Sequence, residues 1–328
     1  MQTQDRYFLT GGQGFIGAWI AKQLLLAGSS CVLFDLKPDD GILAQVFDED
    51  ELRQLERVYG DVGDTEVVRK ALDASQATNV IHLAGLQIPT CRSQPLLGAR
   101  VNVIGTLNIF EAVRQSGGRV KNVVYASSAA VAGSSGDYKG PIADDTPHVP
   151  RTHYGVFKTA NEGSARVYWL DHGIPSVGLR PLAVYGVGRE VGVTSGPTKA
   201  IKAALLRRPY TIGFSGQTAF NYVEDAARIF IDCSKAAREG AQALNMRGEY
   251  LTVEEFAKLV EREVPGSAGL IRVSGGPIPV AYDFVEPGLE KLLGRVPHTP
   301  VADGVHRTAQ RFRRLLELGK LRDQDLAT

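Results

Sequence analysis

The stretch Thr10-Gly11-Gly12-Gln13-Gly14-Phe15-Ile16-Gly17 decides the fold that we expect for this chain. The apolar segment 7–9 before it is short enough to be a buried strand. Residues 18–28 after it are apolar at helical spacing and end in a glycine suited to a helix C-terminus. A strand, a glycine turn and a helix in this order favour the binding of a phosphate group, because the helix N-terminus then faces the anion.

The glycines of this stretch have separate expected roles. Gly12 is predicted to permit the tight turn, Gly14 to let the backbone approach a pyrophosphate, and Gly17 to let the helix lie close on the strand. A second predicted strand, 30–34, leads into Asp35. An acid at that place accepts hydrogen bonds from both adenosine-ribose hydroxyls, which favours NAD over NADP. The sequence therefore predicts an NAD site.

Length and composition narrow the class of protein. The 328 residues allow one large α/β domain with an added lobe, or two domains. Lys and Arg number 37 against 36 acids, so charge gives no reason to expect nucleic acid or a membrane as a partner. The scattered Cys31, Cys91 and Cys233 favour reduced thiols. With the first strand near the N-terminus and no apolar run of membrane-spanning length, we expect a cytoplasmic protein. The His, Cys, Asp and Glu residues do not occur at the sequence spacings that are typical of metal ligands, so no metal site is expected.

Short apolar strands alternate with helical stretches through the first half of the chain. This alternation predicts an α/β fold with a Rossmann-type, doubly wound parallel sheet, whose ligands lie at the carboxyl ends of the strands. We expect residues 1–181 to form the NAD-binding domain and 217–246 to pack back onto it. Residues 182–328 are expected to be mainly a smaller C-terminal substrate-binding lobe.

A tyrosine and a lysine suggest the chemistry. Tyr154 and Lys158 lie four residues apart in a helix predicted from about 153 to 171, so they share one face of it. The pKa of a free phenol, about 10, is too high for a base at neutral pH. A nearby ammonium and an oxidised nicotinamide lower it, which allows Tyr154 to take a hydroxyl proton. Ser128, after the predicted strand 121–126, is expected to hold the substrate oxygen.

Together these segments resemble the extended short-chain dehydrogenase/reductases, the NAD-dependent epimerase/dehydratase family. The resemblance rests on 10–17, Asp35, 60–62, 82–85, 102–106, 127–133, Tyr154 with Lys158, 180–186 and 222–225, in family order. It implies that Ser128, Tyr154 and Lys158 are catalytic. It also implies that NAD contacts Gly11, Gly14, Phe15, Ile16, Gly17, Asp35, Asp61, Val62, Ala84, Gly85, Tyr154 and Lys158.

Departures from the family pattern bear on the substrate. Ala129 and Ala130 stand where dehydratases of the family carry Asp-Glu, so we do not expect elimination of water. Thr218 stands where nucleotide-sugar members usually place an arginine that clamps the diphosphate. Three other arginines of the same lobe could replace it: Arg189, Arg207 and Arg208. Candidate substrate contacts are Gln87, Ser128, Tyr185 and Thr194.

Three functions are compatible with these features. The first is an NAD-dependent oxidoreductase that acts on a secondary hydroxyl or carbonyl of a small polyol, sugar or sugar acid. The second is an NAD-dependent nucleotide-sugar epimerase with a transient ketone, and the third is a non-catalytic nucleotide-sensing regulator. The intact Ser128, Tyr154 and Lys158 argue against the third, because a sensor needs no proton relay.

Helix 97–115 carries two apolar stripes, one of Val103, Leu107 and Phe110 and another of Val101, Ile104 and Val113. One stripe can cover the sheet, and the other stays exposed unless a partner buries it, so we expect a homodimer. The resemblance suggests that this helix pairs with the Tyr154 helix of the same subunit to build a four-helix interface.

Overall fold

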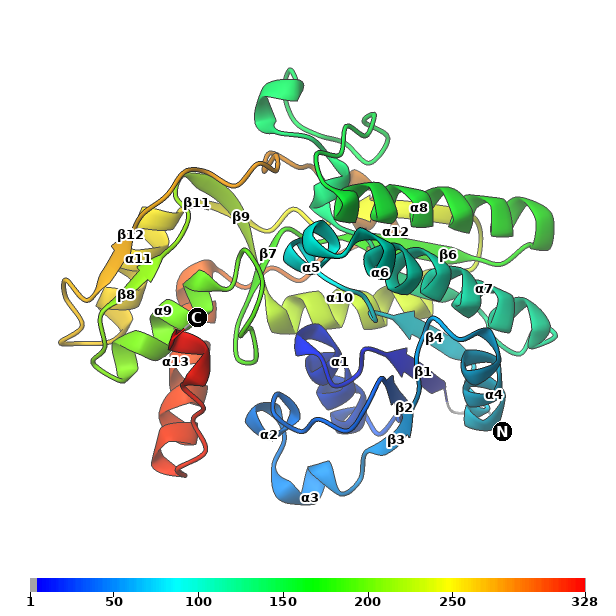
Figure 1. The fold of residues 1–328 in the computed structure, drawn as a ribbon, viewed down its shortest axis with the longest axis horizontal. Coiled ribbons are helices and arrows are strands. Elements are labelled where there is room, and N and C mark those ends of the chain that lie inside the picture. The colour runs from blue at the N-terminus through cyan, green and yellow to red at the C-terminus, as the bar shows by residue number, and fades with distance from the viewer. Residues whose placement is uncertain (1–4, 328) are drawn as a thin grey trace.

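A seven-stranded sheet forms the centre of the computed structural model, which describes residues 5–327 (Figure 1). The strand order is β10-β6-β5-β4-β1-β2-β3, and every neighbouring pair is parallel. The strands are β1 (Arg6–Thr10), β2 (Ser30–Asp35), β3 (Glu56–Tyr59), β4 (Asn79–His82), β5 (Val123–Ala126), β6 (Ser176–Arg180) and β10 (Ala241–Asn245). This arrangement confirms the predicted Rossmann-type α/β fold.

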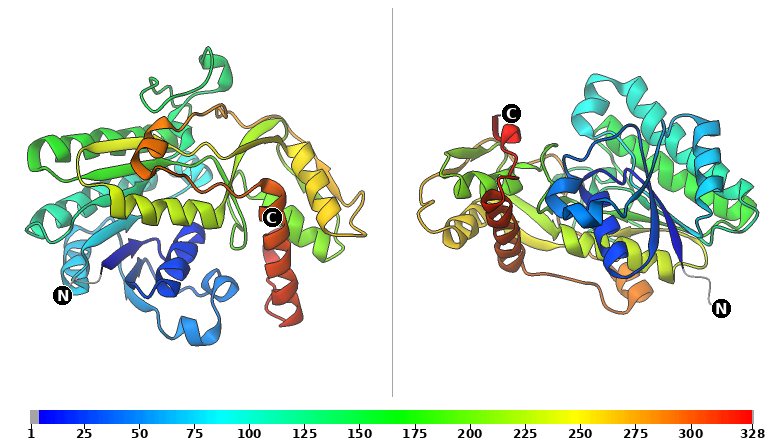
Figure 2. Two further views of the ribbon diagram at one scale, coloured as in Figure 1. Left: turned by 180° about the vertical axis from the view of Figure 1, so that it is seen from behind. Right: turned by 90° about the horizontal axis from the view of Figure 1, so that it is seen from below.

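Helices cover both faces of the sheet, as its buried apolar strands require. Successive residues of β1 point to opposite faces, and Phe8 and Leu9 belong to two separate core clusters. The helices α1 (Phe15–Leu26) and α10 (Val223–Ala236) pack together on one face. On the other face lie α4 (Thr65–Ser75), α7 (Gly105–Gln115) and α8 (His153–His172) (Figure 2).

Side-chain caps set several helix ends. The Asp64 carboxylate accepts hydrogen bonds from two backbone N–H groups at the start of α4, and the Thr152 hydroxyl accepts one at the start of α8. Gly173 ends α8 in the left-handed conformation, with φ 64°. The predicted capping box of Thr252 and Glu255 is present at the start of α11 (Val253–Glu263).

The predicted helix 97–115 is interrupted. It consists of α6 (Pro95–Ala99), a π-helical turn η1 (Arg100–Ile104) and α7.

By length and composition alone, the combined helix Pro95–Gln115 is apolar enough to cross a membrane, contrary to our expectation that no such run exists. In the structure half of this helix is buried, and its α7 part packs on α4 and α8. The predicted separation into two stripes is wrong in part: Phe110 of one stripe and Val113 of the other are both buried in the same core cluster, whereas Ile104 is exposed.

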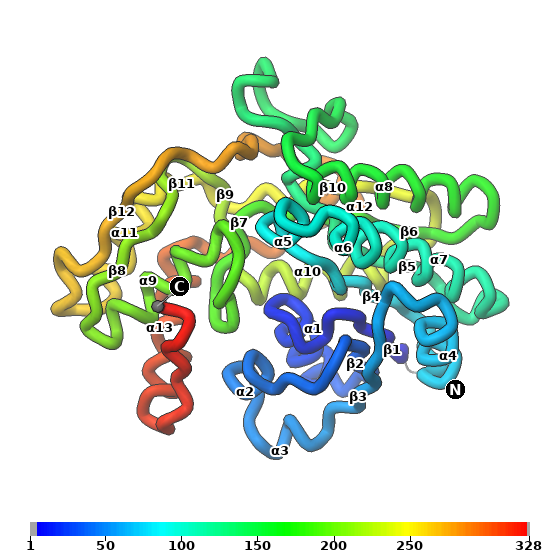
Figure 3. Tube along the Cα trace, in the orientation of Figure 1, coloured from blue at the N-terminus to red at the C-terminus, as the bar shows by residue number. Residues whose placement is uncertain are grey.

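The C-terminal lobe contains two small sheets, which Figure 3 shows beside the main sheet. One has the order β11-β9-β7 and the other pairs β12 with β8. Their strands are β7 (Ala183–Tyr185), β8 (Tyr210–Ile212), β9 (Gln217–Tyr222), β11 (Glu249–Thr252) and β12 (Ile271–Val273). The helices α9 (Gly196–Leu205), α11 and α13 (Val301–Glu317) pack on one another in this lobe. The remaining elements are α2 (Leu43–Val46), α3 (Glu49–Leu52), α5 (Ile88–Ser93), α12 (Pro287–Leu293), η2 (Ala129–Val131), η3 (Ser135–Asp137) and η4 (Gln324–Ala327).

Candidate functional site

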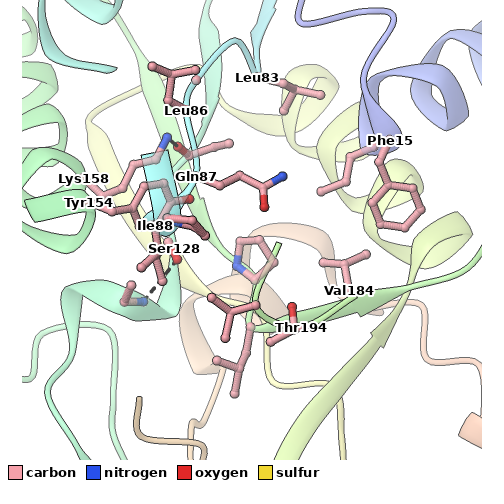
Figure 4. A pocket seen from close by; sticks show the side chains of 18 of the residues that line it. Phe15, Leu83, Leu86, Gln87, Ile88, Ser128, Tyr154, Lys158, Val184 and Thr194 are labelled. Carbon is pink, nitrogen blue, oxygen red and sulfur yellow. Dashed lines mark hydrogen bonds between the residues drawn. The ribbon is translucent and has the colours of Figure 1, made fainter. Parts of the chain in front are cut away.

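A cavity of about 800 Å³ lies at the carboxyl ends of the central strands, between the sheet and the C-terminal lobe. This is the edge at which doubly wound sheets bind their ligands. The lining includes Gly11, Gly14, Phe15, Ile16, Gly17, Asp35, Gly85, Ser128, Tyr154 and Lys158. Figure 4 shows Phe15 on one side of this space and Ser128, Tyr154 and Lys158 on the other. One cavity therefore joins the predicted cofactor turn to the predicted catalytic group.

The glycines at the turn between β1 and α1 lie where a side chain would clash with the backbone. Gly11 adopts φ 66°, and a Cβ there would lie 2.8 Å from the Ala84 nitrogen. A Cβ on Gly17 would lie 2.2 Å from the Gly11 oxygen, so the helix packs directly on the turn, as expected. Gly12 lies in the same turn, and a Cβ there would be 2.9 Å from the Leu33 Cβ. The turn begins at Gly11, the residue with the positive φ, where the chain passes against the segment after β4.

Asp35 ends β2 at the edge of the cavity. Its Oδ2 accepts a hydrogen bond from the Gln13 N–H at 3.1 Å, and its Oδ1 accepts one from the Leu36 N–H at 2.8 Å. These bonds hold the carboxylate beside the glycine turn, where lone pairs of both oxygens remain for further donors. The glycine turn leaves space that side chains at Gly11 and Gly17 would fill, and the fixed Asp35 carboxylate lies beside it. We call this turn the glycine cradle, and together with Asp35 it fits NAD.

We expect Asp35→Ala to weaken NAD binding about ten- to a hundredfold, because it removes hydrogen bonds to a charged acceptor worth about 1.5–3 kcal/mol. The preference for NAD over NADP should also narrow, since a charge that repels the 2′-phosphate is lost. Titrations of both cofactors by fluorescence measure this. Asp50→Ala, which removes an exposed carboxylate of α3, serves as the control and should change neither constant. A wild type that prefers NADP would contradict our interpretation of Asp35.

Three other predicted cofactor residues lie near the cavity but do not line it. The Asp61 carboxylate is 2.6 Å from the Arg100 guanidinium, and Val62 is buried. The Ala84 N–H donates to the Thr10 hydroxyl at 3.2 Å. Their contacts with the cofactor stay a prediction.

The predicted catalytic side chains converge from β5 and α8. Tyr154 lies in the first turn of α8, and Lys158 follows one turn later. The Lys158 Nζ donates to the Ala126 carbonyl at 2.6 Å and lies 5.5 Å from the centre of the Tyr154 ring. The Ser128 Oγ accepts a hydrogen bond from the Ala130 N–H at 3.1 Å, which holds it at the end of β5. All three side chains face the cavity.

Burial has the largest effect on the pKa values of Tyr154 and Lys158. It raises the pKa of the Tyr154 phenol, while a hydrogen bond with Ser128 and the charge of Arg189 act in the opposite direction. Burial lowers the pKa of Lys158 to about 8, and the nearby Cys91 and Glu162 act against that shift. Tyr154 therefore depends on neighbouring positive charge to reach its phenolate form near neutral pH.

The predicted substrate residues divide into two groups. Gln87, Ser128 and Thr194 line the cavity. Tyr185 does not: it is buried in the lobe, and its hydroxyl donates to the Val301 carbonyl at 3.3 Å. Its ring packs against Tyr222, Phe220 and Phe256. We therefore withdraw Tyr185 as a substrate contact, because this aromatic cluster holds it away from the cavity.

Asn102 is a positioning residue whose part the sequence did not reveal. It lies in the π-helical turn η1, where its Oδ1 accepts from the Leu86 N–H at 2.7 Å and its Nδ2 donates to the Leu86 carbonyl at 2.9 Å. These paired bonds hold the segment after β4, including Gly85 and Gln87, against the cavity. A buried polar residue within an apolar helical stretch was the available signal.

A buried ion pair lies behind the predicted catalytic residues, and sequence reasoning missed it. The Glu162 carboxylate accepts from the Arg180 Nε at 2.8 Å and Nη2 at 2.7 Å, and from the Ser127 hydroxyl. Arg180 also donates to the Asp144 carbonyl at 2.9 Å. The pair thus connects β5, β6 and α8 next to Ser128. Since Glu162 follows Lys158 by one helical turn, the spacing could have indicated it.

His82 has a structural part, as general considerations of buried polar groups predict. Its ring nitrogens lie 2.6 Å from the Thr10 hydroxyl and 3.1 Å from the Thr106 hydroxyl. Burial lowers its pKa to about 3, so the ring is neutral at physiological pH.

Comparison with known proteins agrees with this geometry. The family model described as NAD dependent epimerase/dehydratase family matches residues 7–246. The UDP-glucose 4-epimerase of Azospirillum brasilense is 29% identical over 343 residues, covering 95% of this chain and 93% of the relative.

Two solved structures are 25% identical to this chain. The UDP-glucose 4-epimerase of Thermus thermophilus, in complex with NAD, has a TM-score of 0.77 and covers 94% of this chain and 99% of its own. MoeE5 in complex with UDP-glucose and NAD has a TM-score of 0.79, covering 95% and 99%. The match to the family model, the glycine cradle with Asp35 and the site around Tyr154 lead to one conclusion: this chain belongs to the NAD-dependent epimerase/dehydratase family, the extended short-chain dehydrogenase/reductases, and uses NAD.

Proposed function

We propose that the protein is an epimerase that inverts a hydroxyl-bearing carbon of a nucleotide sugar by way of a transient ketone. The observation that carries this proposal is that Ser128, Tyr154 and Lys158 face the same cavity as the glycine turn. The similarity to UDP-glucose 4-epimerases supports it over the polyol oxidoreductase that we placed first from the sequence.

The chain's own residues supply proton handling and orientation. Bound NAD, which the glycine turn and Asp35 would hold, would supply the hydride acceptor and donor. The Tyr154 phenolate accepts the proton of the substrate hydroxyl and gives it back to the same oxygen, so no net proton is consumed. The Ser128 hydroxyl holds that oxygen in both the alcohol and the ketone. Lys158, fixed on the Ala126 carbonyl, keeps a positive charge beside the phenol ring.

Elimination of water needs further acid or base groups beside the sugar. Ala130 lines the cavity and Ala129 is buried next to it, so neither position offers a titratable group. This supports epimerisation over dehydration.

An NAD-dependent oxidoreductase for a small polyol, sugar or sugar acid is the second candidate. The apolar Ile278, Pro279 and Val280 form part of the cavity wall, which favours a ligand with few charges. Incubation of the NAD-loaded protein with UDP-glucose, followed by chromatography of the sugars and NADH absorbance, separates the two. Conversion to the epimer without accumulated NADH supports the epimerase. Stoichiometric NADH with free polyols or sugar acids, and none with UDP-sugars, would replace it by the oxidoreductase.

We also propose a homodimer that buries the outer surface of α6, η1 and α8. Exposed apolar side chains gather there: Leu96, Leu97, Ile104, Val156, Val167 and Leu170. Exposed apolar surface of this kind is unfavourable unless a partner covers it.

We expect Leu170→Asp to convert the dimer to a monomer, because it places a charge in the interface. Light scattering at micromolar protein concentration measures the mass. Leu26→Asp on α1 is the matched control, since Leu26 and Leu170 are each 71% exposed and only Leu170 lies on the proposed surface. A wild-type mass equal to one chain would refute the dimer.

The reduced state of the three cysteines suits a cytoplasmic enzyme, and we propose that location. Cys31, Cys91 and Cys233 form no disulfide in the structure.

A further inference from the structure

Arg189 lies in the segment between β7 and α9 and lines the cavity. Its Nη2 donates to the Thr194 hydroxyl at 3.1 Å, and the guanidinium carbon lies 5.7 Å from the centre of the Phe15 ring. Gly192 allows this segment to approach the opposite wall, since a Cβ there would lie 2.0 Å from the Gln87 Oε1. In Figure 4, Phe15, Gln87 and Thr194 surround the same space.

The charge of Arg189 has no counterion within the described part of the chain. No Asp or Glu oxygen of residues 5–327 lies within 4.0 Å of it, and its buried Nε has no hydrogen-bond partner there. Arg180 and Lys202, two other buried cations, have carboxylates at 2.7 and 2.8 Å. Burial lowers the pKa of Arg189 to about 10, which reflects the cost of this environment. An uncompensated guanidinium facing a cavity is suited to an anionic ligand group.

The other positively charged residues near the cavity are less suited to binding an anionic ligand group. Lys158 is bound to the Ala126 carbonyl beside the phenol, and Arg92 is exposed. Arg207 donates to the Pro265 carbonyl and Arg208 pairs with Asp323, so neither of these arginines lines the cavity. Thr218 is buried in β9 and does not line it either. Of the three arginines that the sequence left open, only Arg189 reaches the cavity.

We propose that Arg189 binds the diphosphate of the nucleotide sugar and so determines whether a substrate of that class is accepted; this inference rests on the proposed function. The planar fork of a guanidinium pairs with two phosphate oxygens at once. The cofactor's own pyrophosphate has other donors, since the first N–H groups of α1 have no partner within the helix. Thr194 fixes one arm of the fork, and the buried Nε has no hydrogen-bond partner among the described residues.

The test compares Arg189→Gln, Arg189→Lys and the control Arg207→Gln in the full-length, NAD-loaded protein. Calorimetry with UDP and UDP-glucose measures substrate affinity, and fluorescence titration measures NAD affinity. We expect Arg189→Gln to weaken UDP binding about ten- to a hundredfold, as loss of hydrogen bonds to a charged group does. Arg189→Lys should recover part of this affinity, because it keeps the charge but not the fork. NAD affinity should stay within about twofold in all three, and Arg207→Gln should bind UDP as the wild type does.

Thermal unfolding with and without UDP provides a second measurement, which also needs no catalytic turnover. Because Arg189 has no carboxylate partner to lose, ligand-free Arg189→Gln should unfold at a temperature no lower than the wild type does. At a UDP concentration a few times the wild-type Kd, UDP should raise the unfolding temperature of the wild type clearly and that of the variant much less.

The possible outcomes separate the two proposals. Unchanged UDP affinity in Arg189→Gln overturns the inference and leaves the proposed epimerase standing. Loss of NAD affinity in that variant also overturns it, and assigns Arg189 to the cofactor's pyrophosphate. If the NAD-loaded wild type binds neither UDP nor UDP-sugars, the proposed function fails and the inference fails with it.

Discussion

Replacing Tyr154 by Phe is expected to lower kcat by about two to four orders of magnitude, the usual contribution of a positioned acid or base. The change removes the group that takes the substrate proton and almost no volume. NAD affinity should therefore stay close to that of the wild type, since the ring and the Lys158 contact with the Ala126 carbonyl remain. Steady-state kinetics and a cofactor titration on the same preparation measure both effects.

Tyr168→Phe provides the control on the same helix. The Tyr168 hydroxyl donates to Glu111 at 2.8 Å on the side of α8 that packs against α7, outside the cavity. That variant should turn over substrate at the wild-type rate. Near-wild-type activity in Tyr154→Phe would remove Tyr154 from the mechanism and with it the proposed proton transfer.

Glu162→Gln is expected to have the largest effect on stability among single substitutions near the site. The glutamate and Arg180 are 8% and 4% exposed, and removing one partner leaves an uncompensated buried charge. Such a loss costs about 3–5 kcal/mol. Arg180 would keep its bonds to the Asp144 carbonyl and the Asn245 amide oxygen, but neither carries a formal charge. Urea or thermal unfolding of the protein gives the free energy directly.

An exposed pair on α4 gives the comparison. Glu66 and Arg69 lie 2.8 Å apart, with Glu66 63% exposed, and such pairs contribute about 1 kcal/mol or less. Glu66→Gln should therefore change the unfolding free energy by no more than that. If Glu162→Gln costs no more than Glu66→Gln, the pair does not hold β5, β6 and α8 together as we argue.

The features that the sequence predicted best depend on local sequence pattern. The glycine turn, the strand that leads into Asp35 and the helix that holds Tyr154 and Lys158 depend on residues close together in the chain. Short-range sterics and hydrogen bonding decide such features, so they can be read without knowing the neighbours. The short strands of the C-terminal lobe, such as β7 and β12, lacked any such pattern because they are three residues long.

The sequence predictions for Tyr185 and Val113 are wrong because their positions depend on contacts and helix geometry that the local pattern does not show. Tyr185 was assigned to the substrate because it follows Pro181 in a familiar order, but the aromatic rings of β9 and α11 surround it. Val113 was placed on the same stripe as Ile104 and apart from Phe110, but the π-helical turn at Arg100–Ile104 shifts the register of the residues that follow, and Val113 shares a core cluster with Phe110. Helical spacing counts residues at a constant interval, and an inserted turn breaks that interval.

The sequence by itself determined the sheet and the cofactor, and it predicted that Tyr154 and Lys158 carry the chemistry. The tertiary structure alone decided which charges have partners. Glu162 meets Arg180 across α8 and β6, and Arg189 meets no carboxylate of the described residues although Arg207 and Arg208 lie in the same lobe. The physical reason is that the energy of a charge depends on its burial and its counterion. Both are set by elements that lie far apart in the chain and come together only in the folded protein.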